Sequence, residues 1–176
     1  RIVTVTQGGN LSTYTSDVRS RRVTRDETGP AVTVTYSGGT SAQEYESTIL
    51  KTEYVRGSDM GGGVGGLLYS DPDSGDTRFY YYNNRGDVTA KTTSATTNLS
   101  YVASYSAFGD RSYESAPSKD PQGPNTKEVG PHKIIHEGMR DRVGHVFYQR
   151  DPAGFVDTTN LYSYVGNNPW TMFDPH

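Results

Sequence analysis

The chain has 176 residues, a formal net charge of -3, a hydrophobic content of 32%, 14 tyrosines and no cysteine. No apolar run approaches the ~18 residues that a membrane-spanning helix needs, and a slightly acidic chain is a poor candidate for nucleic-acid binding. Without cysteine there is neither a disulfide framework nor a thiolate metal site.

Short runs of alternating residues recur along the whole chain and predict β-strands. They lie at 3–5, 32–36, 79–82, 99–105 and 145–150, and they are rich in valine, threonine and tyrosine. Side chains of a strand point alternately to opposite faces, so a period of two indicates a half-buried sheet. Clusters of Gly, Asn, Asp and Pro separate these runs and favour turns. No segment has an apolar stripe at helical spacing over three turns, so we expect a nearly all-β fold built from hairpins.

One stretch interrupts this pattern. Residues 114–131 contain four prolines among lysines, serines and glycines. Because proline lacks the N–H that a strand ladder needs, we expect an exposed loop here. It divides the chain into a strand-rich part at 1–113 and a C-terminal part at 132–176. The apolar cluster at 170–173, which begins with Trp170, is expected to pack the C-terminal part against the strands.

Tyrosine-bearing strands that run into an Asp, Asn or Gly turn occur four times. These units begin at Tyr14, Tyr80, Tyr101 and Tyr162. Similar fragments also arise by chance in a tyrosine-rich β-sandwich, but four units in one chain favour a true repeat.

The repeat units and the tail resemble one protein family. Tyr80–Val88 (Tyr-Tyr-Tyr-Asn-Asn-Arg-Gly-Asp-Val) and Tyr105–Gly109 are similar to the tyrosine–aspartate (YD) repeats of the Rhs family. Glu137–Asp141, Gly144–Gly154 and the segment from Asn160 through the last Asp-Pro resemble the Rhs repeat-associated core domain.

The resemblance implies antiparallel YD-repeat hairpins that form part of a spiral β shell, closed by a C-terminal core domain acting as a plug. Such shells enclose a C-terminal toxin or effector. The implied partners are the remainder of the repeat shell, the enclosed effector, and secretion or toxin-complex components. The implied location is secreted or at the cell surface, and no cofactor, metal or nucleic acid is expected.

In several branches of this family the core domain cuts its own chain as an aspartyl protease. Asp-Pro pairs bracket the tail here, at Asp151 and Asp174. Two adjacent carboxylates cannot both ionise easily, so one can activate water while the other holds a proton. Arg150 adjoins Asp151 and is expected to orient a carboxylate, and Asp157 is a third acidic candidate. The alternative is that these aspartates only cap turns before proline.

The end of the chain departs from the family pattern. There the second Asp-Pro is usually followed by x-Gly-Leu and the cleavage point, whereas this sequence ends at His176, the x position. The expected scissile bond is therefore not in these 176 residues. The competing functional hypothesis is a non-catalytic structural or adhesive cell-surface repeat protein. A downstream Gly-Leu and a compact, unrelated domain would favour encapsulation instead.

Three other motifs favour structural roles. Gly61–Gly66 lacks the Gly-Lys-Ser/Thr of a phosphate-binding loop. His132 and His136 have the spacing of a helical zinc pair, but Pro131 and Gly138 leave barely one turn between them. The aspartates from Asp71 onward lack the glutamate that completes a calcium loop, which favours a simple turn.

Overall fold

The structure, a computed structural model, describes residues 1–7, 9–27, 29–61, 63–116, 121–130, 132–156 and 159–174. The first of its two antiparallel sheets contains eleven strands in chain order. These strands are β1 (Ile2–Gln7), β2 (Asn10–Ser16), β3 (Arg22–Asp26), β4 (Val32–Ser37), β5 (Thr40–Glu46), β6 (Ile49–Arg56), β7 (Leu67–Pro72), β8 (Arg78–Tyr82), β9 (Val88–Thr93), β10 (Thr96–Tyr105) and β11 (Arg111–Glu114).

The second sheet contains four strands in chain order. They are β12 (Glu128–Val129), β13 (Ile135–Glu137), β14 (Arg140–Val143) and β15 (Val146–Phe147), with short 3₁₀ turns η1 (Pro124–Thr126) and η2 (Tyr164–Asn167) nearby. The predicted all-β class is confirmed, although the run at 145–150 contributes only the two residues of β15. In the described part of the chain, no helix has the length and apolarity required to cross a membrane.

The same five-residue turn ends three of the four predicted repeat units. Its first residue is Asp17, Asn83 or Ser106, whose side-chain oxygen accepts the N–H of the fifth residue at 3.0–3.1 Å. The first N–H donates to the fifth carbonyl, and the fourth N–H donates to the first carbonyl. The fourth residue is left-handed in each case: Ser20 (φ 62°), Gly86 (φ 77°) and Gly109 (φ 82°). A short polar side chain that bonds its own backbone explains why these residues stand where each strand ends.

One face of the large sheet is buried and consists mainly of tyrosines and cations. Tyr14, Tyr54, Tyr80 and Tyr101 are each at most 6% exposed. The Lys91 ammonium lies 5.1 Å from the ring centroid of Tyr80 and 4.8 Å from that of Tyr101. Tyrosine provides an apolar ring and a polar tip, so this face excludes water with few long aliphatic side chains.

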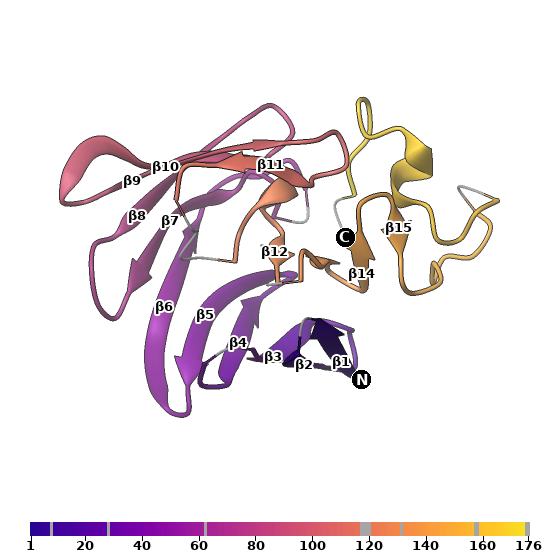
Figure 1. Cartoon of the computed structure of the whole chain (residues 1–176), viewed down its shortest axis with the longest axis horizontal. Coiled ribbons are helices and arrows are strands. Elements are labelled where there is room, and N and C mark those ends of the chain that lie inside the picture. The colour runs from indigo at the N-terminus through magenta and orange to yellow at the C-terminus, as the bar shows by residue number, and fades with distance from the viewer. Residues whose placement is uncertain are drawn as a thin grey trace.

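The large sheet bends into a C with β1 and β11 at its two ends, and β12 lies between those ends (Figure 1). We call the eleven-stranded sheet the wall, and residues 121–130, 132–156 and 159–174 the plug. The Val88 N–H of the wall donates to Gly123 O at 3.1 Å. The plug is therefore joined to the wall by backbone as well as side-chain contacts.

The prediction of an exposed loop at 114–131 is wrong over residues 122–128, all of which are buried. The Asn125 N–H donates to Asp87 Oδ1 at 2.9 Å, and the Thr126 hydroxyl donates to Gly86 O at 2.9 Å and accepts the Gly65 N–H at 2.7 Å. Polar groups can be buried where each finds a partner, and the wall provides those partners. Composition alone did not reveal them.

Candidate functional site

Arg140 lies between the two aspartates that the sequence singled out. Its Nη1 is 3.0 Å from Asp151 Oδ2, and its Nη2 is 3.2 Å from Asp174 Oδ2. All three side chains are largely buried, with exposed fractions of 13–20%. The structure thus brings Asp151 and Asp174 to one guanidinium, although 22 positions separate them in the chain.

The arginine at this site is Arg140, whereas Arg150 is exposed. Arg140 begins β14, and its guanidinium carbon lies 3.7 Å from the centroid of the Phe147 ring. That ring supports the planar cation from one side. The pattern Arg-Asp-Arg at 140–142, directly after a hairpin turn, was the available sequence signal, because alternate residues of a strand share a face.

Asp151 also has the turn role that was the alternative hypothesis. Its Oδ1 accepts the Ala153 N–H at 2.8 Å, while its Oδ2 faces Arg140. One oxygen thus caps the turn and the other belongs to the ion cluster. The third acidic candidate, Asp157, lies outside the described residues.

A second arginine of β14, Arg142, forms a fully buried ion pair next to this cluster. Its Nε and Nη2 lie 2.8 and 2.7 Å from Glu137 Oε1, and both side chains are 0% exposed. Nη1 donates to Phe108 O at 2.6 Å and to Gly144 O at 2.8 Å, and the guanidinium stacks 3.8 Å from the Tyr164 ring centroid. Burial raises the pKa of Glu137, while Arg142 opposes that rise. The positive charge of Arg142 therefore compensates the buried carboxylate of Glu137.

Lys127 links the cluster to the segment docked on the wall. Burial lowers the pKa of Lys127, against the attraction of Glu137 and Asp174. The region around Arg140 thus contains acids and bases held away from bulk water, an arrangement found at both functional sites and structural ion networks.

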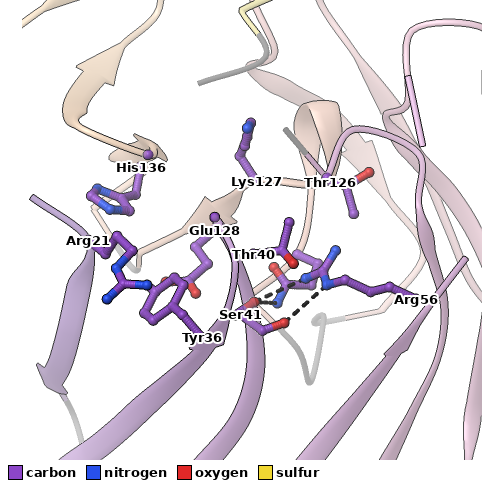
Figure 2. A pocket seen from close by; sticks show the side chains of 13 residues that line it. Arg21, Tyr36, Thr40, Ser41, Arg56, Thr126, Lys127, Glu128 and His136 are labelled. Atoms are coloured by element: carbon purple, nitrogen blue, oxygen red, sulfur yellow. Dashed lines mark hydrogen bonds between the residues drawn. The ribbon is translucent and has the colours of Figure 1, made fainter. Parts of the chain in front are cut away.

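A small polar cavity lies at the junction of wall and plug (Figure 2). It is lined by Arg21, Tyr36 and Arg56 of the wall and by Lys127, Glu128 and His136 of the plug. Its space of about 40 Å³ suits a few water molecules rather than an organic substrate.

The other motifs occupy structural positions. His136 lies on β13 and contacts Asp141, while His132 Nε2 lies 3.1 Å from Ser12 Oγ, so the two histidines do not form a pair on a helix. Asp59 accepts the Gly63 N–H at 2.7 Å within the glycine-rich loop. Across the described ranges, no group of three His, Asp or Glu side chains is arranged to hold a metal ion.

The apolar end of the plug faces solvent. Trp170 is 79% exposed and Met172 is 54% exposed. The prediction that Trp170 packs the plug against the wall is therefore wrong. Docking depends instead on buried polar contacts, because those are what the facing surface of the wall offers.

Solved structures of toxin complexes share this fold. The crystal structure of TcdB2-TccC3 matches with a TM-score of 0.73 and 20% identity over 99% of this chain and 10% of that one. TcdB2-TccC3 without its hypervariable C-terminal region gives a TM-score of 0.70 and 21% identity, over 98% and 9% of the two chains. The Tc holotoxin pore of Photorhabdus luminescens gives 0.70 and 19% identity, over 99% and 9%.

The chain spans about a tenth of the length of the solved chains it matches, and at this identity the likeness shows the fold. No protein-family model and no curated protein matches the sequence.

Proposed function

We propose that this chain is part of an Rhs-type β shell that encloses a C-terminal toxin or effector, with the plug closing the shell. The observation that carries the proposal is the C-shaped wall holding the plug between its two ends (Figure 1). Arg22 near the first end pairs with Asp141 of the plug, and Phe108 near the last end accepts a hydrogen bond from Arg142. A plug fastened at both ends is suited to closing a curved sheet.

One of the matching structures supports the proposal that the enclosed partner is a variable C-terminal segment. One matching structure is named for the removal of a hypervariable C-terminal region, so that protein has a variable segment at its C-terminal end. By analogy, this chain's partners are the rest of its own shell, a variable C-terminal effector, and other components of a secreted or surface-exposed toxin complex.

We further propose that Asp151 and Asp174, with Arg140 between them, perform a single self-cleavage. In this reaction one carboxylate takes a proton from water, and the water oxygen attacks the peptide carbonyl carbon. The C–N bond then breaks, and the leaving nitrogen takes a proton from the other carboxyl group. Arg140 holds both carboxylates in place and offsets their mutual repulsion.

Full-length protein with its natural C-terminus tests both parts of the proposal. We expect the wild type to separate into two chains that still co-elute on size exclusion, and Asp151→Asn or Asp174→Asn to remain a single chain. Asp73→Asn is the matched control, since that exposed carboxylate pairs with Lys51 on the wall surface at 2.5 Å. If the wild type is not cut, or if the Asp151→Asn variant is still cut, the proposal of self-cleavage is wrong. If the two chains separate at once on size exclusion, the proposal that the shell encloses the C-terminal chain is wrong.

The alternative is a non-catalytic structural or adhesive shell. The turn-capping bond from Ala153 to Asp151 favours it, because that bond gives the aspartate a purely structural use. An uncut wild type whose Asp151→Asn variant loses only stability is the result expected from this alternative.

A further inference from the structure

We infer that the wall positions the self-cleavage site: Arg22, by binding Asp141, places the neighbouring Arg140 between Asp151 and Asp174. This inference rests on the proposed self-cleavage and identifies positioning residues for it. Its consequence is that the plug becomes competent for cleavage only once it is docked on a folded wall.

Asp141 is the most heavily bonded carboxylate at the junction. Its Oδ1 lies 2.9 Å from both Arg22 Nη2 and His136 Nδ1, and its Oδ2 lies 2.8 Å from Arg1 Nη2 and 3.0 Å from Gln149 Nε2. Gln149 Oε1 also accepts the Asp141 N–H at 2.6 Å. Two cations of the wall and two side chains of the plug therefore meet on one carboxylate.

Arg22 is held rigidly on the wall side. It is 2% exposed, and its guanidinium carbon lies 4.1 Å from the Tyr14 ring centroid. Its carbonyl accepts the Tyr36 hydroxyl at 2.8 Å. An arginine fixed by a ring and by the sheet provides a defined docking point rather than a flexible surface contact.

The geometry of β14 connects the Arg22–Asp141 contact to the position of Arg140. Asp141 and Arg140 are consecutive in β14, so their side chains point to opposite faces of the small sheet. Asp141 faces the wall and pairs in register with His136, while Arg140 pairs in register with Glu137 and faces the aspartates. Because β14 has only four residues, holding Asp141 limits the movement of Arg140.

The anchor is stable over the ordinary pH range. Burial would raise the pKa of Asp141, but its hydrogen bond with His136 and the charges of His136, Arg22 and Arg1 together hold that pKa far below its usual range. A carboxylate whose folded-state pKa is depressed adds stability above its unfolded value of about 4, and this stability is lost only as pH falls through the folded value. The contact between Arg22 and Asp141 therefore persists in mild acid.

The test measures the self-cleavage rate of the full-length protein with Arg22→Met or Asp141→Asn. We expect cleavage to slow roughly 10- to 100-fold, because small displacements of reacting groups have effects of that size, and we expect Arg22→Lys to recover part of the rate. Glu44→Gln is the matched control. It breaks the buried Arg25–Glu44 pair of the wall, at 2.7 Å. The plug charge that this pair interacts with is Glu128 of β12, which is not part of the Arg22–Asp141 contact. If Glu44→Gln slows cleavage as much as Arg22→Met does, the effect is general destabilisation and the inference is overturned.

Hydrogen exchange of the same proteins gives a readout that does not depend on the self-cleavage reaction. We expect Arg22→Met to reduce protection of Arg140–Val143 and Glu44→Gln to leave it unchanged. If the wild type is not cut but this loss of protection occurs, the proposed protease fails while the positioning by the wall stands. Unchanged protection in Arg22→Met, or cleavage at the wild-type rate in Asp141→Asn, overturns the inference.

Discussion

Replacing Arg142 with methionine is expected to destabilise the plug by about 3–5 kcal/mol, because it leaves the fully buried Glu137 carboxylate without its partner. The carbonyls of Phe108 and Gly144 also lose their donor. Native-state hydrogen exchange over β13 and β14 measures this effect as a lower free energy of local opening.

The loss of plug stability in Arg142→Met is expected to become larger as pH rises. Burial raises the pKa of Glu137, and the variant removes the arginine that opposes the rise. A carboxyl group with a raised folded-state pKa contributes stability below its unfolded value, and this contribution is lost as pH rises through the folded value. The deficit should therefore be smaller at pH 5 than at pH 8.

Two further variants separate charge from packing. Arg142→Met combined with Glu137→Gln removes both charges and should recover much of the stability, and it should also abolish the pH dependence. Lys51→Met removes a solvent-exposed pair with Asp73 on the wall and should change stability far less. Equal losses in Arg142→Met and Lys51→Met would contradict this account.

Replacing Gly86 with alanine is expected to destabilise the docking turn by about 2–5 kcal/mol. Its backbone has φ +77°, which disfavours an L-residue by about 1–2 kcal/mol. A Cβ would also lie 2.5 Å from Val64 Cγ1 and 2.9 Å from Gly65 N, and overpacking of this kind costs about 1–3 kcal/mol. Because the Gly86 carbonyl accepts the Thr126 hydroxyl, we expect faster hydrogen exchange in residues 122–128 of the plug.

Gly75→Ala is the matched control. Gly75 also has a positive φ, at +94°, but no atom lies within 4 Å of a Cβ built there. Only the backbone strain remains, so we expect a loss of about 1–2 kcal/mol with no change at the plug. If the two glycine variants behave alike, close packing at Gly86 is not what restricts it.

Local sequence rules predicted part of the wall, since the expected runs coincide with β1, β4, β8 and β10 of its eleven strands. Period-two alternation predicted strands such as β4 and β10, and the polar residue at the start of each repeat turn was recognisable as a turn former. These features depend on side-chain direction and on short-range hydrogen bonds, and both are properties of neighbouring residues.

The candidate site was only partly predictable. The two Asp-Pro pairs identified Asp151 and Asp174, and the structure places both on Arg140. Arg150 adjoins Asp151 in sequence, but the side chains of neighbours in an extended chain tend to point apart. The partner instead comes from β14, where Arg140 lies 11 positions before Asp151 and 34 before Asp174. The alternation of Arg140 and Arg142 places both on one face of β14, but it does not specify which carboxylate either of them meets.

The sequence by itself determined the all-β class, part of the strands and the turn-forming residues between them, since these depend on interactions within a few residues. It also determined that water must be excluded with tyrosines and few aliphatic side chains, because 32% hydrophobic content allows little else. Only the tertiary structure decided which face of the wall is buried, that residues 122–128 dock there, and which cation meets each buried carboxylate. A buried charge is tolerated only where a partner is in place, and for Asp141 that partner, Arg22, comes from a distant part of the chain.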